Sequence, residues 1–286
     1  MNAPAPGHRA LGAAALMLVL SSCQALQDVA KSLDLNRPTA EITSASLSDL
    51  SLDGVTVLMD VAVTNTYGVD LPLAGLDYGV DIQGRPVVSG VVPAMSTLKS
   101  GVTETIKVPA RLDFMHVLDM VSGLSAGDVV PWSASVDVRV DAPGVGPIAL
   151  PLKTSGELPV PAVPRLSMPS IEWDELSFTE AKATVRLDVF NTNSFPLELD
   201  PSDLSLSLAG TRVASANVNA GRLDGQGTTS LEVPISFKPS DLGLALLSVL
   251  QGSAADYALT GRLAADTPFG ALDFPVDAVG QTSLLR

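Results

Sequence analysis

Few residues in this chain of 286 have the chemistry of a reactive site, and the most informative of them is Cys23, its single cysteine. It closes the sequence Leu20-Ser21-Ser22-Cys23, directly after an apolar run of eleven residues from Ala10 to Leu20. A run of that length is typical of the core of a secretory leader and falls short of the roughly 20 residues that cross a bilayer. A single thiol also excludes an internal disulfide and any zinc or iron–sulfur site built on several thiolates.

The histidines and carboxylates form no catalytic pattern. His8 lies in the leader, so His116 is the only imidazole of the remaining chain, and Leu244 stands at the corresponding position of the second half. We interpret His116 as a surface residue of a helix, because triad catalysis needs a histidine beside a nucleophile. Glu172 and Asp174 are one residue apart in a strand-like segment, where they share a face that is typically solvated. Since calcium-loop, phosphate-loop and GxSxG motifs are also missing from the sequence, we expect no enzyme, no metal site and no cofactor.

The composition indicates an acidic, globular protein. The chain has 31 acidic and 17 basic side chains, a formal charge of −14. This balance argues against binding to nucleic acid, which depends on lysine and arginine neutralising phosphates. It argues equally against adhesion to anionic lipid through a basic patch. The apolar fraction of 46% is near the globular average, so the length suits one large domain or two ordinary ones, each with its own core.

The residues around Cys23 resemble the bacterial lipobox, a four-residue signal that ends in the modified cysteine. The resemblance implies that a signal peptide of residues 1–22 is cleaved between Ser22 and Cys23, and that Cys23 then carries several acyl chains. Several chains hold a protein on a membrane, whereas one gives only marginal binding. Because Gln24 follows the cysteine in place of aspartate, the resemblance implies the outer membrane of a bacterial envelope, and we expect the protein to face the periplasm. The alternative is an ordinary secretory leader followed by an incidental free thiol.

Residues 23–37 form a short segment between the expected anchor and the first domain. Its apolar residues Leu26, Val29, Ala30 and Leu33 have helical spacing, which is compatible with a small amphipathic helix near the membrane or docked on the first domain. The balanced charges of the segment favour the other interpretation, a lipidated tether with some helicity.

The remaining chain has the pattern of two copies of one domain. In each copy an alternating apolar strand leads into Asn-Thr: Val55, Val57, Met59, Val61 and Val63 before Asn65-Thr66, and Ala183, Val185, Leu187 and Val189 before Asn191-Thr192. Such alternation predicts a half-buried strand. The next step, Leu71-Pro72-Leu73, is matched with Phe195-Pro196-Leu197, which gives the first copy two extra residues in the turn.

Further downstream the two copies share strands that end before Gly84 and Gly210, and apolar residues at helical spacing from Phe114 to Val121 and from Leu242 to Val249. About seven short strands and one helix per copy predict an all-β fold, a tandem repeat of antiparallel β-sandwiches of immunoglobulin or fibronectin III type. The expected domains are residues 38–153 and 165–286. Residues 154–164 between them are rich in proline and are expected to form a stiff, extended linker.

The recurring asparagines have a structural interpretation. Asn65 and Asn191 continue the parity of the buried strand positions, so each amide should point toward the core. A buried amide must find partners, and an asparagine at a strand end can bond the backbone of the following turn. We therefore predict a structural turn motif consisting of Asn65, Pro72, Asn191 and Pro196, in preference to a catalytic role.

The succession of a strand ending in asparagine, an apolar-Pro-Leu step, a strand ending at a glycine turn and a later helix resembles the water-stress and hypersensitive-response domain. This is the domain of the second, folded type of late embryogenesis abundant (LEA) proteins. The family usually has Asn-Pro at the strand end, where this sequence has Asn65-Thr66 and Asn191-Thr192. The resemblance covers residues 38–153 and 165–277. It implies a β-sandwich with one helix, a role in tolerance of desiccation or related stress, and no catalytic residues.

These observations lead to one preferred function and two alternatives. The preferred hypothesis is a non-catalytic, stress-protective lipoprotein attached to the membrane through its acyl chains. The second is an envelope scaffold or binding subunit that recruits a protein partner, for which exposed edge strands offer a template. The third is carriage of a lipid in an apolar cavity between the sheets.

Overall fold

The computed structural model describes residues 37–93, 96–142, 146–177, 179–238, 240 and 255–282. Ser22, Cys23 and the tether before Arg37 therefore lie outside the described residues. The same holds for the helix predicted from Leu242 to Val249 in the second copy.

The described residues of the first domain form two antiparallel sheets and one helix. Its elements are β1 (Thr39–Ser48), β2 (Gly54–Thr64), β3 (Leu71–Ile82), β4 (Arg85–Pro93), β5 (Thr97–Leu98), β6 (Thr103–Asp113), α2 (Phe114–Met120), β7 (Val129–Ala142) and β8 (Gly146–Pro159). One sheet has the order β1-β2-β6, and the other has the order β4-β3-β7-β8 with β5 paired to β3.

The second domain repeats this plan. Its strands are β9 (Arg165–Leu176), β10 (Ala181–Phe190), β11 (Leu197–Leu199), β12 (Ser202–Leu208), β13 (Thr211–Val218), β14 (Gly221–Leu223), β15 (Thr228–Phe237), β16 (Ala255–Thr267) and β17 (Gly270–Thr282). One sheet has the order β15-β10-β9, and the other is built around β12 and β16, with β17 paired to β16. The predicted tandem of all-β, antiparallel domains is confirmed.

Alternation along the strands explains why the sheets form two layers. Every apolar position of β2 that alternates in the sequence, from Val55 to Val63, is fully buried, and β7 alternates between exposed and buried residues over most of its length. Side chains at every second position lie on one face of a sheet, so each pair of sheets encloses one apolar core. The described residues contain two such cores, one per domain.

Helix α2 occupies the predicted position in the first domain. Asp113 caps its first turn by accepting a hydrogen bond from the backbone N–H of His116 at 3.0 Å. Phe114 and Val117 are buried on the face toward the sandwich, while His116 is exposed. The helix therefore covers one end of the first core and places its histidine in solvent.

The proline-rich linker is shorter than predicted. Residues 154–159 belong to β8, which pairs with β7 as far as Pro159 opposite Val129. Two side-chain features stabilise this extension: Leu158 is fully buried, and Gly156 lies under the ring of Trp132, where an added Cβ would come within 3.1 Å of three ring atoms. Prolines separated by apolar residues indicate extended backbone, but they do not show whether that backbone pairs with a neighbour.

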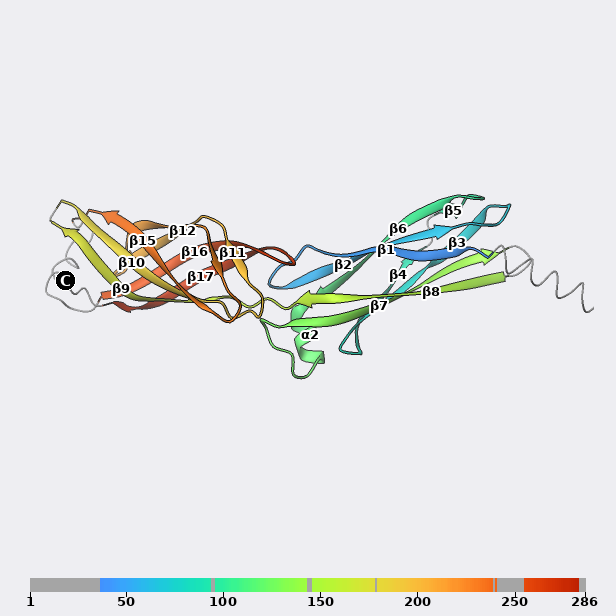
Figure 1. Ribbon diagram of the computed structural model, residues 1–286, viewed down its shortest axis with the longest axis horizontal. Coiled ribbons are helices and arrows are strands. Elements are labelled where there is room, and N and C mark those ends of the chain that lie inside the picture. Colours follow the sequence, from blue (N-terminus) through green and yellow to red (C-terminus); the bar gives the residue numbers. More distant parts are fainter. Residues whose placement is uncertain are drawn as a thin grey trace, which may run out of the picture.

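The two domains lie end to end in an elongated molecule (Figure 1). We call the end of each domain that carries the Asn-Thr turn its asparagine end. The asparagine end of the first domain lies farthest from the second domain, and the chain enters there at Arg37. The asparagine end of the second domain instead meets the first domain, close to the linker.

Candidate functional site

Asn65 is a fully buried amide whose polar atoms all bond to backbone. Its Nδ2 donates to the carbonyl oxygens of Val69 at 2.8 Å and Leu98 at 2.9 Å, and its Oδ1 accepts from the N–H of Tyr67 at 2.9 Å. The side chain thus ties the turn after β2 to β5, a strand more than thirty residues farther along the chain. Both donor hydrogens are engaged, so the amide has none left for a substrate.

Asn191 has the equivalent role in the second domain and is also fully buried. Its Nδ2 donates to the carbonyl oxygens of Phe195 at 2.9 Å, Asp224 at 3.2 Å and Leu223 at 3.4 Å. Its Oδ1 accepts from both the backbone N–H and the side-chain amide of Asn193, at 3.0 and 2.9 Å. The recurring asparagine therefore holds a turn in each domain.

The threonine that follows each asparagine has a matching function, which sequence reasoning missed. The Thr66 hydroxyl donates to the carbonyl oxygen of Arg37 at 2.8 Å, and the Thr192 hydroxyl donates to that of Val163 at 3.1 Å. Both contacts span 29 positions and secure the chain where it enters the first strand of its domain. The recurrence of Asn-Thr in both copies was the sequence signal that could have indicated this function of the threonine. Proline at this position has no hydroxyl, so it could not donate the hydrogen bond that holds the entering chain.

The predicted equivalence of Pro72 and Pro196 is wrong. Leu71 pairs with Leu98 and Leu197 pairs with Leu223, so the two leucines are the equivalent residues and the two prolines are not. The turns have the same length, since Asn65 and Asn191 each stand 19 positions before the next glycine turn at Gly84 and Gly210. Val69 consequently corresponds to Phe195. The shared Pro-Leu dipeptide was misleading because a proline fits either the turn or the start of a strand.

Hydrogen bonds of the backbone and of two side chains join the two domains at the linker. Gly127 donates to the carbonyl oxygen of Val160 at 2.6 Å, and its own carbonyl oxygen accepts from the backbone N–H of Ser194 at 2.7 Å and the Ser194 hydroxyl at 2.9 Å. Asn193, fully buried, pairs through its amide with both backbone groups of Ala162, at 2.7 and 2.9 Å. The linker is therefore fixed from both sides.

Apolar contacts accompany these bonds. Leu50, in the turn before β2, packs against the cores of both domains, and Leu52 and Val129 of the first domain pack against the core of the second. A hollow of about 370 Å³ remains between the turn Leu50–Asp53 and the start of β17. Relative motion is the default for domains joined in one chain, so the packing and the bonds at this junction predict that the motion between the two domains is restricted.

Gly127 should be the most sensitive position of this junction. Its φ is +100°, and a Cβ there would lie 2.5 Å from the carbonyl oxygen of Thr192. We expect Gly127→Ala to cost about 1–3 kcal/mol of strain and to separate the domains. Small-angle scattering should then show a broader distribution of interdomain distances. Gly68→Ala, where a Cβ meets nothing within 4 Å, is the matched control; equal scattering of both variants would contradict a rigid junction.

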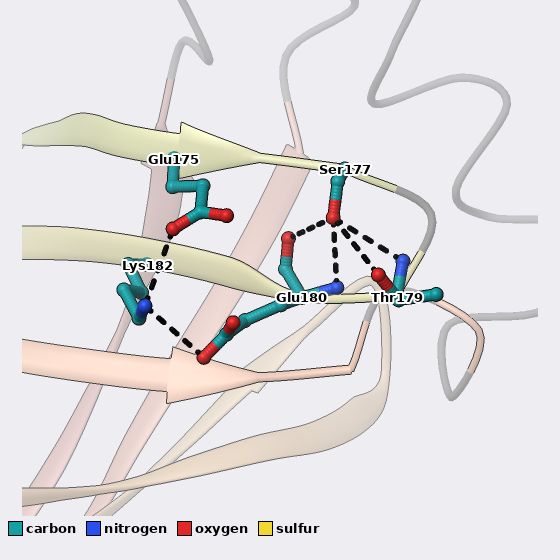
Figure 2. A network of polar contacts seen from close by, with 5 residues as sticks. All are labelled: Glu175, Ser177, Thr179, Glu180 and Lys182. Carbon is teal, nitrogen blue, oxygen red and sulfur yellow. Dashed lines mark hydrogen bonds and ion pairs between the residues drawn. The ribbon is translucent and has the colours of Figure 1, made fainter.

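A polar network occupies the far end of the second domain (Figure 2). The Ser177 hydroxyl donates to the carbonyl oxygen of Glu180 at 2.9 Å and accepts from the backbone N–H groups of Glu180 and Thr179 at 3.0 and 3.3 Å. Lys182 lies between the carboxylates of Glu175 and Glu180, at 3.2 and 3.3 Å.

This network lacks the features of a catalytic serine. The hydrogen bond that Lys182 donates to the Glu175 carboxylate, followed by the one to Glu180, raises the pKa of Lys182 above its ordinary value, whereas a lysine acting as a general base needs a lowered pKa. The Ser177 hydroxyl engages backbone and not a base. The group therefore shapes a turn.

The other residues considered as catalytic candidates do not form a site together. His116, Glu172 and Asp174 are exposed, and Arg186 approaches Glu172 only at 3.8 Å. Within the described ranges there is no cluster of three or more histidine, cysteine, aspartate or glutamate side chains that could hold a metal ion. None of the helices in that part of the chain is long and apolar enough to cross a membrane.

Comparison with known proteins relates both domains to one family. A family model described as late embryogenesis abundant protein matches residues 60–156 and 186–280. The desiccation protectant protein Lea14 homolog of Glycine max is 25% identical over 133 residues, which are 46% of this chain and 88% of that protein. Protein Lea14-A of Gossypium hirsutum is 25% identical over 135 residues, 47% of this chain and 89% of its own length. The solution structure of AT1g01470 from Arabidopsis thaliana is 22% identical, covers 43% of this chain and 82% of that protein, and has a TM-score of 0.36.

Proposed function

The chain belongs to the late embryogenesis abundant protein family, and from that premise we propose that it is a non-catalytic protector of the bacterial envelope during desiccation or related stress. We further propose that acyl chains on Cys23 anchor it to the outer membrane, with both domains facing the periplasm. The described relatives of Glycine max and Gossypium hirsutum each align with about half of this chain, and the first is named a desiccation protectant.

The main observation behind this proposal is that the polar residues shared by the two copies make structural hydrogen bonds within the protein. Asn65 and Asn191 bond only to backbone or to a neighbouring amide, and Thr66 and Thr192 secure chain entry. The residues that the two copies share thus stabilise the sandwich. Each domain presents charged side chains to its surroundings, such as the exposed pair Arg139–Asp77 in the first domain and the exposed pair Lys182–Glu175 in the second.

A charged, rigid surface has a physical use in a drying cell. With a formal charge of −14 the protein repels its own copies and retains counterions and water. Anchored at a membrane, it would keep partly unfolded neighbours apart as the water volume falls. The fixed junction supports this role, because an elongated body excludes other proteins from a larger volume than a collapsed one.

A second candidate function is a binding module for a protein of the envelope. The edge strands β4 and β17 carry the exposed side chains of Val91, 60% accessible, and Val279, 73% accessible. An edge strand can pair with a strand of a partner. Crosslinking in cells separates the two functions: one dominant, stoichiometric partner supports the binding module, and a diffuse set of neighbours supports protection.

Deletion of the gene tests the protective function. We expect the deletion strain to survive drying less well than its parent and to leak periplasmic contents after rehydration. A copy that encodes the unchanged protein should restore both properties. Survival and envelope integrity equal to those of the parent, after drying and after salt shock, would overturn the proposal.

A further inference from the structure

The asparagine end of the first domain exposes apolar side chains at positions that are covered in the second domain. Val69 and Phe195 are equivalent, because each carbonyl oxygen accepts a bond from the asparagine amide four residues earlier. Phe195 is 4% exposed and packs edge-on against Phe269, whereas Val69 is 52% exposed. The side chain of Val69 thus lacks the cover that its counterpart has.

Two neighbouring positions are also more apolar in the first domain. Val102 corresponds to Gly227, because the carbonyl oxygen of each accepts from the backbone N–H of its domain's asparagine, at 3.1 and 2.9 Å. Val102 is 43% exposed. Tyr67 stands where Asn193 of the second domain grips the linker, two residues after the asparagine. We call Tyr67, Gly68, Val69 and Val102 the Val69 surface.

The second domain shows what this end of the sandwich does: it receives the segment of chain and the domain that precede it. Asn193 and Ser194 bind the linker and Gly127 there. At the first domain the preceding segment is residues 24–36. Its C-terminal end is joined to Arg37, whose carbonyl oxygen accepts a bond from the Thr66 hydroxyl beside the Val69 surface.

We propose that residues 24–36 dock on the Val69 surface as an amphipathic helix, with Leu26, Val29, Ala30 and Leu33 facing the valines. These four residues form one apolar stripe at helical spacing. A helix of this length is marginal by itself in water, so it needs an apolar partner to form. Because the segment is covalently joined at Arg37, the surface is presented to it at a high effective concentration.

The alternatives fit less well. Asp70 borders the surface, and its bond from Lys99, followed by that from the Ser100 N–H, holds the pKa of that carboxyl below its ordinary value. The Lys99 ammonium is thus already paired at 2.8 Å and is not free to bind the phosphate of an anionic lipid. A second copy that repeated the arrangement of the interdomain junction would present the far end of its second domain. There Ser177 repeats the bonds of Ser51, but Glu180 and Lys182 stand in place of Gly54 and Thr56 (Figure 2). Those charges disfavour stacking on valines.

Amide hydrogen exchange of the whole protein, purified from cells in detergent, tests the docking. We expect residues 24–36 to exchange at least ~10-fold more slowly than an unstructured peptide of the same sequence. The double variant Val69→Asp/Val102→Asp should remove this protection. The matched double variant Val91→Asp/Val279→Asp, at two valines that are still more exposed and lie away from the surface, should keep it.

The reciprocal variant keeps the test valid if the first double variant unfolds the domain. Leu33→Asp lies outside the sandwich, and it should abolish protection of residues 24–36 and speed exchange of the amides at Gly68 and Val69, while β2 and β6 stay protected. The proposal is overturned if residues 24–36 are unprotected in the unchanged protein or remain protected in these variants. It is equally overturned if protection needs high protein concentration, which indicates a second copy, or phosphatidylglycerol vesicles, which indicates the membrane.

Discussion

Replacing Asn191 with leucine should lower the free energy of unfolding of the second domain by about 3–5 kcal/mol, since each buried backbone group left without a partner costs about 1–3 kcal/mol. The groups concerned are the carbonyl oxygens of Phe195 and Asp224 and the backbone N–H of Asn193. Leucine has a similar volume, so the loss reports the hydrogen bonds and not a cavity. Urea unfolding, followed by tryptophan fluorescence and circular dichroism, measures it.

The same substitution should also loosen the junction. The Asn193 amide bonds both to Asn191 and to the linker at Ala162, so losing the first contact frees it to leave the second. Asn65→Leu should destabilise the first domain to a similar extent and leave the junction intact. Asn219→Leu, at an exposed asparagine of the second domain, is the control. A loss at Asn191 no larger than that at Asn219 would show that the turn does not depend on the amide.

Replacing Cys23 with alanine should release the protein from the membrane. Incorporation of labelled palmitate should fall to background, because the only thiol available for acylation has gone. Each buried CH₂ group of an acyl chain contributes about 0.8 kcal/mol to membrane binding. Without acyl chains the protein should therefore leave the membrane pellet and appear in the soluble fraction, apart from any molecules that still carry the leader. Metabolic labelling followed by fractionation of cells measures both effects.

Ser21→Ala serves as the comparison for Cys23→Ala, because it changes a residue of the same segment and keeps the thiol. It should retain the label. Equal palmitate incorporation with and without Cys23 would overturn the proposed anchor. The protective function could still be tested by drying, because a secreted protein without an anchor could also protect. Loss of label together with unchanged survival would separate the anchor from the protective function.

Alternation and spacing were enough to predict the fold class of this protein. The apolar positions of β2 and β10 recur every second residue, and those of α2 recur every third or fourth, so the sequence itself determines which faces are buried. The inward direction of Asn65 and Asn191 follows from the same parity. These properties are local, because they depend on the backbone geometry of one element and on the polarity of its side chains.

The partners of those side chains were decided by tertiary structure alone. The bonds from Asn65 to Leu98 and from Thr66 to Arg37 join residues that are 33 and 29 positions apart, and no local pattern encodes which backbone group will stand there. The pairing of β7 with β8 through Pro159, and the mismatch of Pro72 with Pro196, have the same origin. The sequence thus determined which residues turn inward and that the domain occurs twice. The tertiary structure decided what they meet, because register and domain contact depend on groups that only folding brings together.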